Sequence, residues 1–269
     1  MPDAGRIPVC LSIAGSDSGG GAGIQADLKA FARAGVHGTT AITAITAQNT
    51  VAVTAVEAVS PAMIVAQVRA VVDDIGVDVV KVGMLGSVAS ARAVGEALDL
   101  LALGTPIVVD PVMVAESGAR LLDEDAQRAL VELVVARATV VTPNLPEARV
   151  LAGDDALEGE ALARAVHALG PAYVVVTGGH RPEVTDVFFD GSAITPIPGE
   201  RHPGGAAHGS GCTHSSALAA HLALGFEPLA AARRAKEIAA AAVRDGLRDV
   251  GAGSGPVDAL GVGDRTSVA

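Results

Sequence analysis

One cysteine stands where a helix is expected to begin, in the segment Gly209-Ser210-Gly211-Cys212-Thr213. The free N–H groups of a first helical turn and the helix dipole together form a site for an anion such as a phosphate, and small residues let those groups converge. The same field favours the thiolate form of Cys212, which suits a base or a nucleophile. The other interpretation is that Cys212 is only a small residue that fills space at a helix start.

A glycine-rich segment, residues 15–23, follows the first expected strand and opens the first expected helix. In an open α/β sheet, ligands lie in the crevice beyond the carboxyl ends of the strands, which places these glycines and Asp27 near a site. The spacing does not satisfy G-x-G-x-x-G followed by a ribose-binding acid, so a dinucleotide site is disfavoured. A small-molecule pocket and a merely flexible turn remain as interpretations.

Asn144 and Glu147 lie three residues apart, directly after another expected strand. On a short helical turn both side chains point the same way and can hold a hydrated Mg²⁺ through water. An ordinary helix start contains the same residue types, because proline and glutamate are favoured in a first turn. The motif alone leaves both interpretations open.

An amide side chain, Gln48, occurs at the end of an expected strand. It can pair with the edge of a heterocycle, although without context a polar turn is the simpler interpretation. No Gly-Lys pair occurs in the sequence, which excludes a Walker A phosphate loop.

Along the chain, apolar runs of strand length alternate with segments whose apolar residues recur at helical spacing. These are the elements that must position the candidate residues. The repetition predicts right-handed crossovers and a mostly parallel sheet with helices on both faces. The expected parallel strands are 7–14, 40–46, 79–82, 107–109, 140–142 and 173–176, and 187–190 with 193–197 form an expected antiparallel edge hairpin. The expected helices are 24–34, 62–75, 88–103, 124–136, 159–169, 213–224 and 229–248. The irregular stretch 199–211 is a candidate binding loop or lid.

Composition narrows the class of protein. The chain has 269 residues, half of them apolar, which predicts a large core and a single domain over residues 1–269. A net charge of −11 and only 2% aromatic residues disfavour nucleic acid as a partner. The longest uncharged stretches, 38–56 and 202–226, are broken by polar residues, so no membrane span is expected. Two cysteines are too few for a disulfide framework, which favours a reducing cytoplasm.

Seven segments occur in order between residues 14 and 213: AGSDSGGGAGIQADLKAF, AITAITAQNT, KVGML, DPVM, TPNLPEA, TGGH and HGSGCT. Together they closely resemble the hydroxymethylpyrimidine/phosphomethylpyrimidine kinases of thiamine biosynthesis, within the ribokinase-like superfamily. The resemblance implies a ribokinase-like three-layer sandwich, commonly a homodimer. It also implies Mg²⁺-dependent transfer of phosphate from ATP to the hydroxymethyl group of 4-amino-5-hydroxymethyl-2-methylpyrimidine, and then to the resulting monophosphate.

The resemblance also implies roles for residues of the substrate pocket. Gln48 would read the amino and ring-nitrogen edge of the pyrimidine. The ring faces would contact Met84 and Val112, and the hydroxymethyl group would lie near Gly15, Ala22 and Asp27.

Catalytic and nucleotide-binding roles follow from the same resemblance. Cys212 stands where many ribokinase relatives have an aspartate base, so it would draw the proton from the attacking hydroxyl group. Gly209, Ser210 and Gly211 would stabilise charge on the transferring phosphoryl group. Asn144 and Glu147, with Asp110, would position Mg²⁺ against the nucleotide phosphates.

One position departs from the family pattern. A lysine that contacts nucleotide phosphates usually precedes the Gly-Gly-His of the family, and here that position is Thr177, followed by Gly178, Gly179 and His180. Thr177 and Gly179 remain expected nucleotide contacts. Arg181 is expected to replace part of the missing charge, with Arg120 as the alternative.

Two other functions stay open on the sequence. A pyridoxal kinase of the cysteine-bearing subgroup would have the same fold and base with a pyridine substrate, and Gln48 favours the pyrimidine because an amide both donates and accepts hydrogen bonds. The second alternative is a non-catalytic protein that binds the pyrimidine in the same pocket but no longer transfers phosphate. The missing lysine leaves this alternative open.

Overall fold

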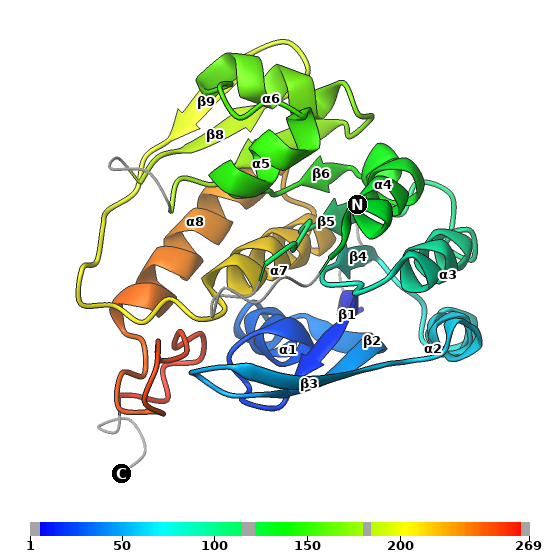
Figure 1. The fold of residues 1–269 in the computed structure, drawn as a ribbon, viewed down its shortest axis with the longest axis horizontal. Coiled ribbons are helices and arrows are strands. Elements are labelled where there is room, and N and C mark those ends of the chain that lie inside the picture. The colour runs from blue at the N-terminus through cyan, green and yellow to red at the C-terminus, as the bar shows by residue number, and fades with distance from the viewer. Residues whose placement is uncertain (1–5, 115–121, 180–183, 265–269) are drawn as a thin grey trace.

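The computed structural model describes residues 6–114, 122–179 and 184–264. In this part of the chain, nine strands form one sheet in the order β3-β2-β1-β4-β5-β6-β7-β8-β9 (Figure 1). The strands are β1 (Val9–Asp17), β2 (His37–Gln48), β3 (Val53–Ala58), β4 (Val79–Val82), β5 (Ile107–Val109), β6 (Val140–Val141), β7 (Tyr173–Val176), β8 (Asp186–Phe189) and β9 (Ile194–Ile197).

The centre of the sheet is parallel and its edges are antiparallel. Strands β2, β1, β4, β5, β6 and β7 run parallel, whereas β3 pairs antiparallel with β2, and β8 pairs antiparallel with both β7 and β9. The central strands β4, β5 and β6 are short, rich in valine and buried at every residue, as a covered parallel sheet requires. The predicted mostly parallel sheet with an edge hairpin is confirmed.

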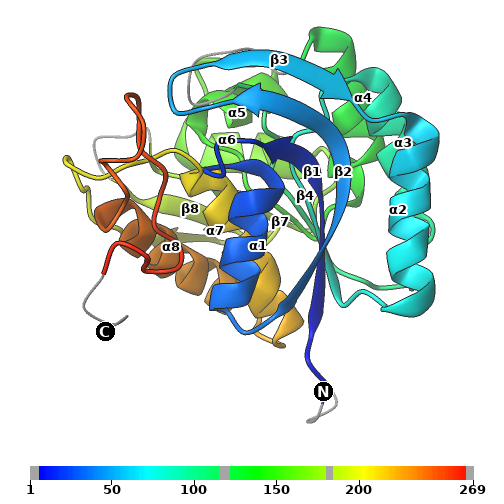
Figure 2. The same ribbon diagram turned by 90° about the horizontal axis from the view of Figure 1, so that it is seen from below.

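Helices cover both faces of the sheet (Figures 1 and 2). One face is covered by α1 (Gly23–Arg33), α7 (Ser210–Ala223) and α8 (Pro228–Arg244), which share a core built on Phe31 and the alanines of α7 and α8. The other face packs against a larger core. The helices of that second layer are α2 (Pro61–Asp74), α3 (Val88–Leu98), α4 (Glu124–Leu133), α5 (Leu145–Ala152) and α6 (Gly159–His167). The three-layer sandwich is therefore as predicted.

Strand β3 was not anticipated, and of helix α5 only the start was. Strand β3 is almost entirely exposed, so its sequence lacks the apolar alternation that marks a half-buried strand. Helix α5 spans only eight residues, and the side chains of Asn144 and Glu147 form a reciprocal capping box at its start. Among the described helices, none is both long and apolar enough to cross a bilayer.

The parallel topology decides where a site can form. The carboxyl ends of β1, β4, β5, β6 and β7 meet along one edge of the sheet, and the first turn of α7 lies against the same edge. Residues far apart in sequence are thereby brought to a single crevice, at the position where open α/β sheets bind ligands.

Candidate active site

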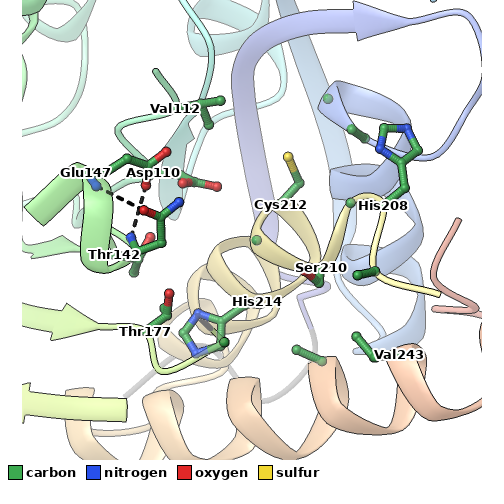
Figure 3. A pocket seen from close by; sticks show the side chains of 18 of the residues that line it. Asp110, Val112, Thr142, Glu147, Thr177, His208, Ser210, Cys212, His214 and Val243 are labelled. Atoms are coloured by element: carbon green, nitrogen blue, oxygen red, sulfur yellow. Dashed lines mark hydrogen bonds between the residues drawn. The ribbon is translucent and has the colours of Figure 1, made fainter. Parts of the chain in front are cut away.

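A cavity of about 550 Å³ opens at this edge of the sheet (Figure 3). The parallel strands contribute residues at or just beyond their carboxyl ends: Gly15 within β1, Gln48 at the end of β2, Met84 after β4, Asp110 after β5, Thr142 after β6 and Thr177 after β7. The loop 199–209 and the first turn of α7 complete the wall. The cavity is large enough for a small molecule and a nucleotide's phosphates together.

The structure brings fourteen of the sixteen residues predicted for the site to the wall of this cavity. They are Gly15, Ala22, Gln48, Met84, Asp110, Val112, Asn144, Glu147, Thr177, Gly179, Gly209, Ser210, Gly211 and Cys212. Asp27 is placed elsewhere, and Arg181, like its alternative Arg120, lies outside the described residues.

The turn into α7 leaves some of its backbone N–H groups open to the cavity. Gly209 has a φ of +86° and lies so close to Gly21 that a Cβ atom here would be 1.7 Å from the Gly21 carbonyl oxygen. No other residue type fits that conformation and that approach. The N–H group of Ser210 donates to the Ala207 carbonyl oxygen at 3.0 Å. No side chain caps the first turn of this helix, so the N–H groups of Gly211 and Cys212 are available to an anion.

Cys212 is half-buried in the first turn of α7, and its side chain points away from the helix toward β1 (Figure 3). The backbone N–H of Gly23, at the start of α1, faces Sγ and lowers the pKa of the thiol. Enclosure by the protein raises the pKa of the thiol to about 12, although the ammonium of Lys81 acts in the opposite direction. The expectation that the thiolate is favoured is therefore wrong, because the loss of hydration outweighs the helix field.

Asp27 does not face the cavity, and the expectation that it is exposed to a ligand is wrong. Its side chain is fully buried, one turn into α1. Its two oxygens accept hydrogen bonds from Lys81 Nζ at 2.9 and 3.1 Å, from Ser12 Oγ at 2.5 Å and from Ser216 Oγ at 2.7 Å. The carboxylate thus ties α1 to β1, β4 and α7 from behind the cavity wall.

A pair of buried carboxylates, Asp110 and Glu147, forms the opposite side of the cavity (Figure 3). Burial and the neighbouring charge of Asp110 raise the pKa of Glu147 to about 8, and burial also raises the pKa of Asp110. The helix-start interpretation of Asn144 and Glu147 holds, because Glu147 accepts a hydrogen bond from the Asn144 backbone N–H at 3.0 Å. The same carboxylate nevertheless lines the cavity beside Asp110.

These carboxylates fit a hard divalent cation that keeps most of its water. Two like charges that disfavour each other's ionisation in a buried site are relieved by a cation, and oxygen donors suit Mg²⁺. Within the described ranges, no three His, Cys, Asp or Glu side chains are grouped to hold a metal directly. Asp110 and Glu147 would be the donor pair for such an ion, and water would supply the remaining ligands.

The wall around Gln48 is suited to a flat ring. A Cβ atom at Gly15 would be 2.3 Å from the Cε atom of Met84, so the glycine makes room for that methionine side chain. Gln48 is half-buried, and its Oε1 accepts a hydrogen bond from Thr46 Oγ1 at 3.1 Å. That bond orients the amide while its NH₂ group stays available as a donor.

Sequence reasoning missed a buried pair that connects two walls of the cavity. His208 Nε2 lies 3.0 Å from Asp17 Oδ2, and the same carboxylate accepts backbone N–H bonds from Gly19, Gly21 and Ala22. Burial alone would raise the pKa of Asp17, but the His208 contact and these N–H groups hold it below its usual value. Asp17 lies in the glycine-rich segment and His208 in HGSGCT. The sequence holds one indication of this contact, which is that a carboxylate stands among glycines whose backbone N–H groups can donate to it.

A second missed cluster lies near Thr177. Lys236 Nζ, from α8, is 2.5 Å from Asp186 Oδ1, and His214 Nε2 is 3.3 Å from Asp186 Oδ2. The backbone N–H of Gly178 donates to Asp186 Oδ1, the oxygen that Lys236 contacts, at 2.7 Å. Gly178 follows Thr177, so the cluster lies beside the position where the family has its lysine. Lys236 and His214 both line the cavity and bring basic groups to that side.

Comparison with known proteins places these features in a family. The sequence profile of the family described as phosphomethylpyrimidine kinase matches residues 17–258. The hydroxymethylpyrimidine/phosphomethylpyrimidine kinase of Rhizobium meliloti (strain 1021) is 48% identical over 93% of this chain and 96% of its own length.

Solved structures agree in fold. The pyridoxal kinase of Bacillus subtilis, solved as an ADP complex, has a TM-score of 0.86 and 37% identity over 96% of this chain and 99% of its own. The phosphomethylpyrimidine kinase of Clostridium difficile 630 has a TM-score of 0.75 and 37% identity over 86% of this chain and 97% of its own. The expected ribokinase-like sandwich is thereby confirmed. The chain is a phosphotransferase that belongs to the phosphomethylpyrimidine kinase family.

Proposed function

We propose that the protein transfers the γ-phosphoryl group of ATP to the hydroxymethyl group of 4-amino-5-hydroxymethyl-2-methylpyrimidine, and then to the resulting monophosphate. One observation carries the proposal. A single cavity joins an uncapped helix start with a thiol, a pair of buried carboxylates, and a wall with an amide and a methionine. These are the parts that a phosphoryl acceptor, a metal–nucleotide and a flat heterocycle require.

The substrate ring is proposed to lie between Met84 and Val112, with Gln48 at its amino and ring-nitrogen edge. Gln48 presents both a donor and an acceptor, which matches an aminopyrimidine edge. Gly15 and Ala22 lie on the same wall and would leave room for the hydroxymethyl group.

Transfer is proposed to occur at the first turn of α7. The N–H groups of Gly209, Gly211 and Cys212 stabilise the charge that develops on the transferring phosphoryl group, and one such donor is worth about 3 kcal/mol. The N–H group of Ser210 is not free for this role, because it donates to the Ala207 carbonyl oxygen. Cys212 takes the proton from the attacking hydroxyl group. Because the thiol has a raised pKa, its ionised form is a minor species that must be formed before it can act as a base.

The carboxylates of Asp110 and Glu147 would hold Mg²⁺ through water, with Asn144 fixing the position of Glu147 through the capping box. The ion would offset the negative charge of the nucleotide phosphates. The acidic net charge of the chain is no obstacle, because the helix start and the metal act locally.

On the nucleotide side, Thr177 and Gly179 remain proposed contacts. Arg181 is proposed to supply part of the charge that a lysine at position 177 would bring, and Lys236 contributes a second cation on this side. The variant Arg181→Ala should raise the KM for ATP or lower kcat. Unchanged steady-state constants would remove Arg181 from this role.

The nearest alternative is phosphorylation of pyridoxal, because several solved structures of this fold are pyridoxal kinases. Parallel assays with hydroxymethylpyrimidine and pyridoxal, which follow ADP release with ATP and Mg²⁺, decide between them. Faster turnover with the pyrimidine is expected, and faster turnover with pyridoxal would replace this assignment. Thermal stabilisation by the pyrimidine with no ADP release would instead support a non-catalytic binder.

We also propose a cytoplasmic homodimer in which residues 1–269 form one domain. Strand β3 is an edge strand whose residues are nearly all exposed, and such edges are commonly covered in assemblies. Light scattering coupled to size-exclusion chromatography should give twice the mass of the chain, 26.6 kDa. A monomer mass at micromolar concentration would reject the dimer.

A further inference from the structure

A lysine, Lys81, lies in the middle of the apolar strand β4 and has no role in the proposed transfer. Its side chain is 0% exposed, and the other three residues of β4 are buried valines. Removing an ammonium from water is costly unless it is paired. Asp27 provides the pair, with the Nζ atom 2.9 Å from Oδ1 and 3.1 Å from Oδ2.

The position of this ion pair relative to Cys212 is set by α7. Ser216 follows Cys212 by four residues, so the two side chains lie on the same face of the helix, one turn apart. Ser216 Oγ donates to Asp27 Oδ1 at 2.7 Å, and Asp27 in turn holds Lys81. Lys81 also lines the cavity that Cys212 lines. The ammonium therefore lies beside the face of α7 that carries the thiol.

The ammonium of Lys81 has one N–H group that does not bond to Asp27. An ammonium has three N–H bonds. In the described part of the chain, the hydrogen bonds of Lys81 go only to the two oxygens of Asp27. Gly83 keeps the space around Nζ open, because a Cβ atom there would lie 2.8 Å from it.

We propose that Lys81 is a positioning residue that stabilises negative charge on the Sγ atom of Cys212, and that Asp27 holds it in place for that purpose. The proposal rests on the role of Cys212 as the base. The charged groups near the thiol come from three elements: Lys81 on β4, Asp27 on α1 and Asp110 after β5. Burial is the main cause that raises the pKa of the thiol, Lys81 lowers it, and the two carboxylates raise it.

The thiol first loses its proton to water in the cavity, and the thiolate forms an ion pair with the Lys81 ammonium. As the hydroxyl oxygen of the substrate bonds to the γ-phosphorus, its proton passes to Sγ. The bond from the phosphorus to the oxygen of ADP breaks, and ADP leaves with that electron pair. Lys81 keeps its proton throughout: burial lowers its pKa, but the negative charges of Asp27, Cys212 and Asp110 together hold the pKa of Lys81 above its usual value.

The test measures the rate at which iodoacetamide alkylates Cys212 between pH 7 and 9.5. Peptide mass spectrometry separates the product at Cys212 from any product at Cys10, which is fully buried. The proteins compared are the wild type, Lys81→Met, Lys81→Met with Asp27→Asn, and Ser216→Ala. The last variant loosens the cluster without changing a charge, so it is the matched control. Circular dichroism melts show which of them are folded.

Lys81→Met should slow alkylation of Cys212 about tenfold or more at a fixed pH, because one pKa unit is a factor of ten in thiolate. The double variant should lie between Lys81→Met and the wild type, since it also removes the opposing carboxylate. Ser216→Ala should stay within about twofold of the wild type.

Faster or unchanged alkylation in Lys81→Met would overturn the proposal, and so would an equal slowing in Ser216→Ala. If Lys81→Met fails to fold, the double variant decides, because it buries no unpaired charge: slower alkylation than in the wild type supports the proposal and an equal rate rejects it. Alkylation needs no kinase activity. A failure of the proposed function would therefore appear in the substrate assays alone, whereas a failure of this inference appears in the thiol chemistry.

Discussion

The Nε2 atom of His208 lies 3.0 Å from the Oδ2 atom of Asp17, and this contact joins the glycine-rich turn after β1 to the loop that leads into α7. The turn carries the proposed substrate wall, and the loop carries the proposed phosphate site. One side-chain pair therefore holds these two parts of the cavity wall together.

Asp17→Asn should destabilise the protein most at neutral pH. The pKa of Asp17 in the folded chain lies below its usual value of 3.8, so its contribution is present above about pH 4 and is lost as the pH falls through the folded pKa. We expect a loss of about 1–3 kcal/mol at pH 7 that shrinks toward pH 3. Thermal unfolding at several pH values measures it. A loss independent of pH would mean that the charge of Asp17 is immaterial.

Cys212→Ala should lower kcat about 100-fold or more while leaving pyrimidine binding nearly unchanged, as expected for removal of a general base. Steady-state kinetics and calorimetric titration with the pyrimidine separate the two effects. Wild-type turnover in this variant would remove Cys212 from the role of base.

Asp27→Ala should destabilise the fold by about 3–5 kcal/mol, because it leaves the ammonium of Lys81 buried without a counter-charge. Ser12→Ala is the milder control, since it removes one of the hydrogen bonds to Asp27 and keeps the ion pair. Urea unfolding of both variants is the measurement. Equal losses would show that the charge pairing at Asp27 is unimportant.

Glu147→Gln should stabilise the protein increasingly as the pH rises. The pKa of Glu147 is about 8 in the folded chain and 4.5 ordinarily, so the folded state binds more protons between these values. Stability is therefore lost as the pH rises from about 4.5 to 8, and the loss is complete above that window. Glutamine keeps the capping acceptor without the charge.

The same carboxylate gives a prediction for the metal. Added Mg²⁺ should raise the Tm of the wild type more at pH 9 than at pH 6, because the ionised pair Asp110 and Glu147 binds the ion better. Glu147→Gln should lose most of this difference. A Tm shift by Mg²⁺ that is the same at both pH values in both proteins would argue against a metal here.

Gly209→Ala should lower both the Tm and kcat, the latter about 100-fold, because the added methyl group meets the Gly21 carbonyl oxygen and strains a φ of +86°. Gly211→Ala is the matched control for stability. A Cβ atom there has only Asp110 Oδ2 as a neighbour, at 3.9 Å. Similar Tm losses in both variants would contradict a specific need for glycine at position 209.

Much of the fold could be predicted from the sequence because its strands are short runs of valine and isoleucine and its helices have a clear period. Strand β3 escaped prediction because it is exposed on nearly every residue. The expected irregular loop ends at Gly209, where α7 begins. The order of the seven motifs predicted fourteen residues that line one cavity. The spacing within any single motif left two interpretations open.

What could not be predicted depends on burial and on contacts between distant segments. The sequence places Asp27 after a strand, but only the fold shows that it turns inward to meet Lys81, 54 residues away. The field of a helix start predicts an ionised Cys212. In the folded protein, enclosure of the thiol raises its pKa and keeps it protonated at neutral pH. The partners Asp17 and His208 are 191 residues apart, and local spacing does not reveal such a pair.

The carboxylate of Asp27 carries a mechanical implication as well as an electrical one. Its bonds to Ser12, Lys81 and Ser216 fasten two strands and α7 to α1, so α7 cannot slide or tilt without breaking a buried ion-pair network. The floor of the cleft is then stationary, and tightening around the reactants is expected from the loop 199–205, which precedes His208 and its contact with Asp17.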